Sequence, residues 1–201
     1  APLHAILDGS HPAVRRLAFE ELLGHHLSLR RLRQQLQERA RAPELAVESA
    51  LVARFRAALP FRLTGAQERV DSELANDLAR PQAMLRLVQG DVGSGKTVVA
   101  AMAALRAVEA GWQAAVMAPT ELLAEQHHRN FSQWLAPLGV EVAWLSGRLG
   151  TRQREEALTA VASGRAMVAV GTHALFQEAV QFQRLGRGSV DEQQRFGVHQ
   201  R

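Results

Sequence analysis

The chain contains no cysteine, and only one of its 24 basic residues is a lysine. Without cysteine it forms no disulfide framework and no thiolate metal site, which is typical of a reducing compartment. Charged residues break every apolar run before the roughly 20 residues that a membrane-spanning helix needs. The first residues also lack the basic-then-apolar pattern of a secretory signal. We therefore expect a cytoplasmic location and no membrane partner.

Neither composition nor charge is unusual in other respects. Hydrophobic residues make up 47% of the 201 residues and charged residues 22%, which are globular values for a chain long enough to bury a core. The net charge is +4. Nine arginines face six acids in residues 1–60, a bias that permits a polyanion partner without indicating one. Solvated arginine on helix faces is the commoner cause of such a bias.

Two patterns meet near residue 60. Before it, apolar residues recur at helical spacing over 11–27, 28–41 and 43–59, and Gly24 and Pro43 punctuate these predicted helices as breaks. We therefore expect a helical linker segment over 1–60 and a separate domain over 61–201.

After residue 60, short apolar runs alternate with helical patterns. This alternation is typical of βαβ crossovers and predicts an α/β fold, a mostly parallel sheet flanked by helices. Ligands of such sheets bind beyond the carboxyl ends of the strands. The expected strands are 84–89, 113–118, 140–145 and 166–171, and the expected helices are 95–110, 120–136 and 150–163.

The lone lysine lies in a glycine-rich stretch that matches G-x-x-x-x-G-K-[ST], between a predicted strand and a predicted helix. Glycines allow successive N–H groups to point at phosphate oxygens, and the helix that follows adds its positive end. A compact ammonium fits this tight loop, whereas the planar guanidinium of arginine does not. The predicted nucleotide-binding residues are Gly90, Asp91, Val92, Gly93, Ser94, Gly95, Lys96 and Thr97, the last also offering a hydroxyl to Mg²⁺.

A second candidate lies upstream, in the stretch LTGAQ. The side-chain amide of Gln67 has the donor and acceptor needed to read an adenine edge, and Phe61 or Leu63 would pack on the ring. The alternative is an ordinary helix start, because Thr64 followed three residues later by Gln67 forms a capping box. The residues alone favour the capping box.

Three further segments follow predicted strands. They are APTELLAEQH at 118–127, LSG at 145–147 and GTHALFQ at 171–177. Each places small or hydroxylated residues where N–H and O–H groups are able to hold a sugar-phosphate backbone. Each alone is also explained as a helix cap; together, on one sheet edge, they favour a nucleic-acid surface.

The last candidate is the carboxylate pair Asp191 and Glu192. In phosphoryl-transfer sites the first such residue holds Mg²⁺ and the second orients and deprotonates the attacking water. A lone pair of this kind means little, but one about a hundred residues after a phosphate loop is typical of an NTP hydrolase.

Taken in order, these motifs resemble the first motor domain of a superfamily-two DNA helicase of the RecG type. The resemblance implies a P-loop NTPase (RecA-like) fold, ATP as cofactor, and translocation on branched double-stranded DNA at stalled forks and Holliday junctions in bacteria. It implies catalytic roles for Lys96, Asp191 and Glu192, Mg²⁺ ligation by Thr97 and Asp191, and adenine contacts from Gln67. The implied DNA-side residues are Pro119, Thr120, Gly147, Gly171, Thr172 and His173.

The chain departs from this family at two places. Gln194 stands where the family has a histidine that couples the nucleotide site to a second motor domain. Residues 185–190, LGRGSV, replace a continuous apolar strand, so Arg187 would be a buried charge and Gly186 and Gly188 would weaken the strand. We hypothesise that this strand is displaced or that the sequence is locally altered.

Proteins of the family that the chain resembles also have a second motor lobe and an amino-terminal wedge domain, and the 201 residues contain no segment that resembles either. We therefore expect a truncated gene product or an isolated domain that binds nucleotide weakly and hydrolyses it hardly at all. Two alternatives stay open: a nucleotide- or DNA-binding module without turnover, and the motor half of a transcription-repair coupling factor-like translocase. A small-molecule kinase is a distant third. The adjacent His127 and His128 are expected to be solvated.

Overall fold

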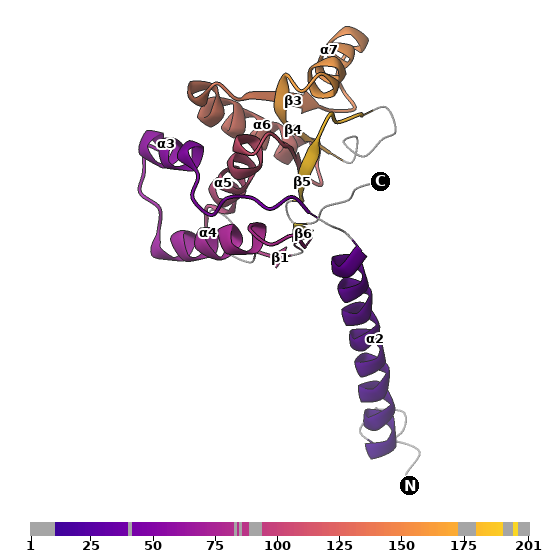
Figure 1. The fold of residues 1–201 in the computed structure, drawn as a ribbon. Coiled ribbons are helices and arrows are strands. Elements are labelled where there is room, and N and C mark those ends of the chain that lie inside the picture. The colour runs from indigo at the N-terminus through magenta and orange to yellow at the C-terminus, as the bar shows by residue number, and fades with distance from the viewer. Residues whose placement is uncertain are drawn as a thin grey trace. The chain divides into compact units, whose positions relative to one another are not determined.

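The computed structural model describes residues 11–39, 42–82, 84, 86–88, 94–172, 180–190 and 195–196. The chain divides into two compact units, Ala1–Ala40 and Arg41–Arg201. The second unit contains, in chain order, α3 (Ala50–Ala58), α4 (Gly65–Leu78), β1 (Arg86–Leu87), α5 (Lys96–Glu109), β2 (Gln113–Met117), α6 (Glu121–Leu135), the 3₁₀ turn η1 (Ala136–Leu138), β3 (Glu141–Leu145), α7 (Thr151–Ala162), β4 (Ala166–Gly171), β5 (Leu185–Val190) and β6 (Arg195–Phe196) (Figure 1).

The sheet of the second unit has the strand order β1-β6-β5-β2-β4-β3. The strands β5, β2, β4 and β3 run parallel to one another, and β2, β3 and β4 are strands that the alternating pattern predicts. β6 is antiparallel to both β5 and β1. Of the predicted strand over 84–89, the described residues form only the two-residue strand β1. Nε of Arg86 in β1 donates a hydrogen bond of 2.7 Å to the Asp77 carboxylate on α4.

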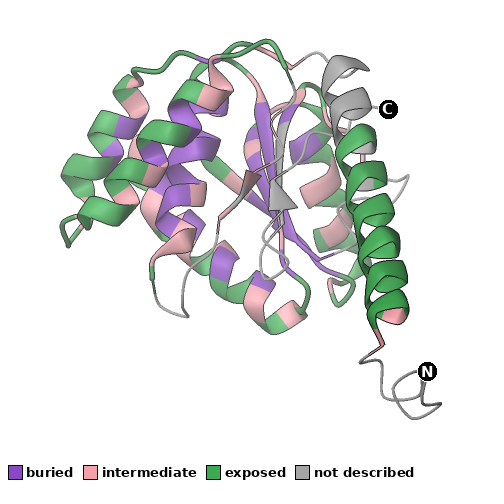
Figure 2. Ribbon diagram, turned by 90° about the horizontal axis from the view of Figure 1, so that it is seen from below, coloured by how far each residue is buried: buried purple, intermediate pink, exposed green. Residues whose placement is uncertain are grey.

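Both faces of this sheet are covered, which explains why its strands read as apolar runs. Val168 and Val170 of β4 pack with α3, α4, α5 and α6 in one cluster, and Ala169 packs with α7 in the other. Figure 2 shows the buried residues concentrated in the strands and the helix beside them, with exposed residues on the outer helices. Buried strands of this kind hold their carboxyl-terminal ends in fixed positions.

The segment at 185–190 forms a strand and pairs with β2, so it is not displaced from the sheet. The pairing jumps from Gln113↔Leu185 to Ala114↔Arg187, which leaves Gly186 as the extra residue of a β-bulge. Gly186 is buried, and a Cβ there would lie 2.6 Å from Cβ of Trp112. The glycine that the sequence suggests to be a weakness is therefore the residue that admits the Trp112 side chain.

α3 belongs to the core of the second unit. Phe55 is 1% exposed and meets Trp134 edge to face, with ring centroids 6.0 Å apart. The carboxylate of Glu109 on α5 accepts hydrogen bonds from the N–H groups of Ala50 (3.0 Å) and Leu51 (3.2 Å). The compact unit thus begins at Arg41, earlier than the predicted domain boundary after residue 60.

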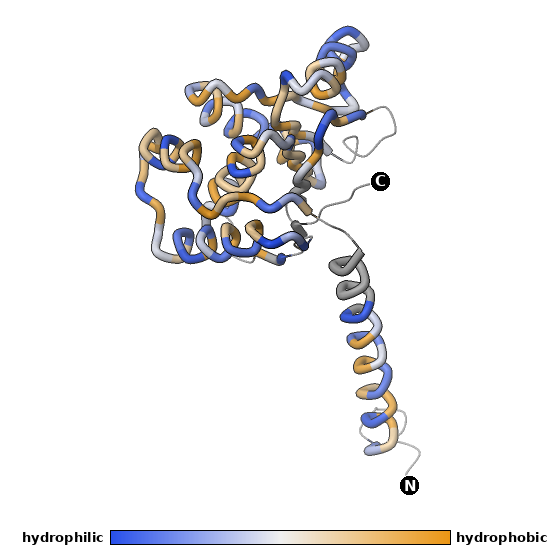
Figure 3. Tube along the Cα trace, viewed as in Figure 1, coloured by the Kyte–Doolittle hydropathy of each residue, from blue (hydrophilic) through white to orange (hydrophobic). Residues whose placement is uncertain are grey.

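The first unit contains one helix, α2 (Pro12–Arg39), of 28 residues. Pro12 occupies the first helical position, where its missing N–H has no effect. The predicted break at Gly24 is wrong: the helix runs through it, because one glycine costs about 1 kcal/mol relative to alanine and long flanking turns outweigh that. Figure 3 shows hydrophobic and hydrophilic residues interspersed along this helix. Within the described part of the chain, no helix has the length and apolar character to cross a membrane.

Candidate functional site

The start of α5 has the geometry of an anion site. Gly95, the N-cap residue, has φ 80°, a conformation that favours glycine, and no described side chain caps the helix. The N–H of Val98 donates to the backbone oxygen of Gly95 at 3.1 Å, and the positive end of the helix dipole lies at this turn. Lys96 and Thr97 open the helix and are half-buried, so both lie at the place where phosphates bind to such an end.

Gln67 lies directly against this helix start. Its Nε2 donates a hydrogen bond of 2.9 Å to the backbone oxygen of Ser94, and a Cβ on Gly95 would lie 2.0 Å from the same nitrogen. The glycine is thus required by its backbone angle and by the close approach of Gln67. These residues fit a phosphate group. Gly95 leaves the backbone accessible because it has no side chain, and the Gln67 amide fixes the loop next to it.

The alternative interpretation of Gln67 as a capping residue is confirmed. Oε1 of Gln67 accepts from the N–H of Thr64 at 2.8 Å, and the hydroxyl of Thr64 accepts from the N–H of Gln67 at 3.3 Å. The amide therefore uses its oxygen at the helix start and its nitrogen at the loop. Phe61 is 46% exposed, whereas Leu63 packs against the core, so of these two candidate ring partners only Phe61 presents an open side chain.

Several predicted residues lie outside the described part of the chain. They are Gly90, Asp91, Val92, Gly93, His173, Asp191, Glu192 and the departure Gln194. Within the described residues no group of three or more acidic, histidine or cysteine side chains could hold a metal.

The described DNA-side residues, Pro119, Thr120, Gly147, Gly171 and Thr172, lie at the carboxyl ends of β2, β3 and β4, which are neighbours in the sheet. Pro119 and Thr120 are exposed, and the Thr120 hydroxyl caps α6 by accepting from the N–H of Leu123 at 3.4 Å. Gly147 is also exposed. Thr172, by contrast, is 2% exposed, so its hydroxyl points into the protein and not toward a ligand.

Sequence reasoning missed the residue that joins these segments, Glu121. Its carboxylate accepts hydrogen bonds from the hydroxyls of Ser146 and Thr172 (3.3 Å to the latter) and from the N–H of Gly147 at 3.4 Å. The partners lie 25, 26 and 51 residues along the chain, so no local pattern announces the contact. Glu121 therefore connects the ends of β2, β3 and β4. We call the exposed residues at these ends, Pro119, Thr120, Gly147 and Arg148, the joined surface.

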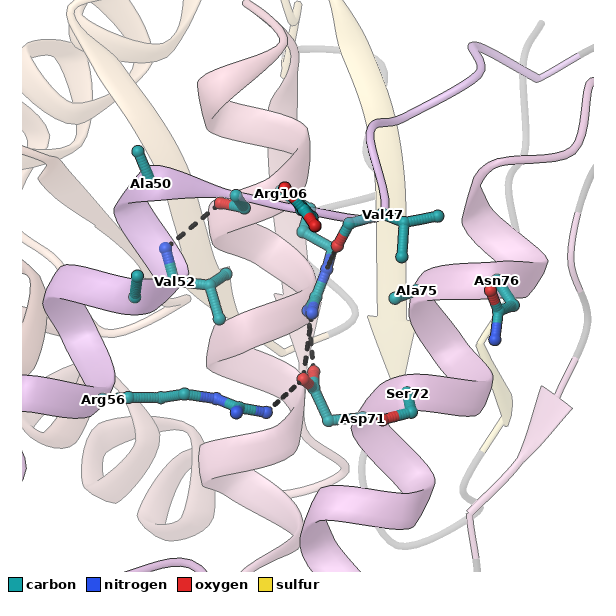
Figure 4. Close-up of a pocket in the computed structure, with 12 residues that line it drawn as sticks. Val47, Ala50, Val52, Arg56, Asp71, Ser72, Ala75, Asn76 and Arg106 are labelled. Carbon is teal, nitrogen blue, oxygen red and sulfur yellow. Dashed lines mark hydrogen bonds and ion pairs between the residues drawn. The ribbon is translucent and has the colours of Figure 1, made fainter.

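A cluster of three charged residues lies in a pocket of about 610 Å³ between α3, α4 and α5 (Figure 4). Asp71, 1% exposed, binds Arg106 through two hydrogen bonds of 2.7 and 2.9 Å and Arg56 through one of 2.7 Å. Figure 4 shows both guanidinium groups converging on this carboxylate. This single carboxylate ties α3, α4 and α5 together, and the two guanidinium groups exceed it by one positive charge, with the Arg56 side chain 38% exposed.

The predicted solvation of His127 and His128 is wrong. His127 is 7% exposed, and the ring of His128 packs on Trp144 with centroids 5.2 Å apart. Burial lowers the pKa of His128, opposed in part by a backbone hydrogen bond to Val142 and by the charge of Glu125. Both histidines lie on the packed face of α6, because the helix turns its apolar stripe toward β3 and β4.

Comparisons with known proteins identify the family. The DEAD/DEAH box helicase family model matches residues 67–201. "ATP-dependent DNA helicase RecG" from Escherichia coli O127:H6 is 58% identical over 193 residues, which cover 96% of this chain and 28% of that protein. The protein of the same name from Acidithiobacillus ferridurans is 56% identical over 191 residues, 95% of this chain and 28% of that one.

Among solved structures, one described as RecG bound to a three-way DNA junction superimposes with a TM-score of 0.82 at 41% identity. The superposition covers 92% of this chain and 25% of that chain. The chain therefore spans little more than a quarter of the length of the curated relatives it matches.

Proposed function

Because the chain belongs to the DEAD/DEAH box helicase family, we propose that it is the nucleotide-binding motor domain of a RecG-type ATP-dependent DNA helicase. In the intact protein this motor remodels branched double-stranded DNA, such as stalled forks and Holliday junctions, during recombination and repair in the bacterial cytoplasm. The observation that carries the proposal is the start of α5, where Lys96 follows a glycine of positive φ, together with three joined ends of neighbouring strands, in a chain 58% identical to a RecG helicase.

The nucleotide half of the proposal assigns a role to each group at the start of α5. The N–H groups after Gly95 and the ammonium of Lys96 bind the phosphates of ATP. Gln67 holds the loop at Ser94 in this structure. When nucleotide binds, its amide exchanges these contacts for the adenine edge, and Phe61 packs on the ring. Thr97 and Asp191 would hold Mg²⁺, which neutralises phosphate charge, and Glu192 would orient and deprotonate the attacking water.

The DNA half assigns the sugar-phosphate backbone to the exposed groups of the joined surface. Pro119, Thr120 and Gly147 are exposed, whereas Gly171 and Thr172 are buried and would support them from within. His173, the next residue of the same motif, is assigned to DNA from its place in the sequence alone. Contacts to phosphate and sugar carry no sequence information, which suits a motor that moves along any sequence. Selection of the branch point belongs to a wedge domain, and completion of the hydrolytic site to a second motor lobe, in the intact protein.

The test is binding of fluorescent DNA, a three-way fork against linear duplex of equal length, followed by anisotropy over a salt series. We expect the chain to bind both substrates with similar affinity and with log Kd rising linearly against log salt, since phosphate contacts release counterions. The Lys96→Ala variant serves as a control and keeps this DNA affinity. Absence of DNA binding even at low salt would contradict the DNA half of the proposal.

A further inference from the structure

Glu121 is the first residue of α6 and the meeting point of three strand ends. Its Oε2 accepts from the Ser146 hydroxyl, and its Oε1 accepts from the Gly147 N–H at 3.4 Å and from the Thr172 hydroxyl at 3.3 Å. Glu121 itself follows β2, Ser146 follows β3, and Thr172 follows β4. One carboxylate thus joins the ends of three parallel strands.

The two hydroxyl partners are committed to this contact. Ser146 is 5% exposed and Thr172 is 2% exposed, so neither hydroxyl reaches a ligand on the surface. A buried hydroxyl without an acceptor costs about 1–3 kcal/mol, and the carboxylate removes that cost for both. The contact therefore fixes the loops internally and does not present these groups to DNA.

The effect extends one step outward through Ser146. Its Oγ also accepts from the N–H of Arg148 at 3.1 Å, and the N–H of Leu149 donates to its backbone oxygen at 3.4 Å. The side chain of Arg148 is exposed at the rim of the joined surface. The Glu121–Ser146 hydrogen bond thereby holds the turn that carries an exposed guanidinium.

From these contacts we propose that Glu121 is a positioning residue for DNA binding: it locks the ends of β2, β3 and β4 into one surface and sets the Arg148 turn, without touching DNA. The inference rests on the proposed function for its DNA partner. The loop contacts themselves do not depend on the proposed function, because they are measurable in the protein without DNA.

A purely electrostatic role and a positioning role for Glu121 predict opposite changes in DNA affinity when the carboxylate is removed. If the carboxylate were only a negative charge near DNA, its removal would strengthen binding to the phosphate backbone. If it positions the loops, its removal weakens binding, because a glutamine presents an NH₂ donor where donors already converge. The sign of the change in affinity therefore separates the two.

The experiment compares Glu121→Gln with Glu125→Gln, which removes the same charge one turn along α6. Glu125 is a fair match because its side chain is 57% exposed and its described ion pair is a local one to Arg129, 3.6 Å away. For each variant we would measure fork-DNA affinity, ATP-analogue affinity, the thermal midpoint, and amide hydrogen exchange over 145–149. We expect Glu121→Gln to lose roughly 5- to 30-fold in DNA affinity, the range of one to two hydrogen bonds, with ATP-analogue affinity unchanged.

Hydrogen exchange distinguishes a failure of this inference from a failure of the proposed function. Faster exchange over 145–149 in Glu121→Gln but not in Glu125→Gln supports positioning even if the wild-type chain binds no DNA, in which case the proposed function fails. Unchanged exchange, or DNA binding that strengthens equally in both variants, would overturn the inference. A double-mutant cycle with Ser146→Ala is expected to be non-additive, since both changes break one contact; additive losses would overturn the route through Ser146.

Discussion

Replacing Lys96 by alanine is expected to weaken binding of an ATP analogue by roughly 10- to 150-fold. That range corresponds to about 1.5–3 kcal/mol, the contribution of a hydrogen bond to a charged group. Lys96 is the first residue of α5, next to the glycine whose φ of 80° opens the helix start. The measurement is fluorescent ATP-analogue binding in the presence of Mg²⁺.

Two further variants sharpen this result. Lys96→Arg keeps the charge but replaces a point ammonium with a planar fork, so we expect it to recover only part of the lost affinity. Arg129→Ala removes an exposed cation from α6 and is expected to leave affinity unchanged. Equal affinity in wild type and Lys96→Ala would contradict the assignment of this helix start to phosphate.

Shortening the chain to residues 61–201 is expected to abolish cooperative folding, whereas residues 41–201 retain it. The shorter chain loses Leu45, Val52 and Phe55, which are 3%, 4% and 1% exposed. Removing one such large apolar side chain costs about 2–5 kcal/mol, and whole domains are stable by only about 5–15 kcal/mol. Urea denaturation followed by circular dichroism measures the difference.

A single substitution checks the same point without changing chain length. Phe55→Ala is expected to lower the free energy of unfolding by about 3–5 kcal/mol. Leu22→Ala, in the other compact unit, is its control and should leave the main transition unchanged. If residues 61–201 unfold with the same midpoint as 41–201, the predicted boundary after residue 60 is the better description of the domain.

The sequence predicts the strands and helices of the sheet well because their signals are local. β2, β3 and β4 lie within one residue of the apolar runs that predict them, and Thr120 and Thr64 cap α6 and α4 as their positions indicate. Strands buried on both faces appear as short apolar runs, and the amphipathic helices between them repeat apolar residues every three to four positions. The parallel sheet, with its motifs at the carboxyl ends of the strands, follows from the alternation of these two patterns.

Contacts between distant residues could not be predicted in the same way. The bulge at Gly186 depends on the Trp112 side chain, and the buried pair of Asp71 and Arg106 joins residues 35 positions apart. Glu121 likewise looks like an ordinary acidic residue in a first helical turn. Only the fold brings its three partners to it, so the residue that connects the candidate DNA surface has no local sequence signal.

The most direct test of the account is steady-state ATP hydrolysis by this chain with and without fork DNA, beside Lys96→Ala. An arginine supplied from a second lobe is worth on the order of 10³–10⁵ in rate for such motors. We therefore expect the chain to bind the ATP analogue and DNA, yet to show fork-stimulated hydrolysis no greater than that of Lys96→Ala. Robust fork-stimulated hydrolysis that Lys96→Ala abolishes would contradict the proposal that turnover needs a group supplied from outside residues 1–201.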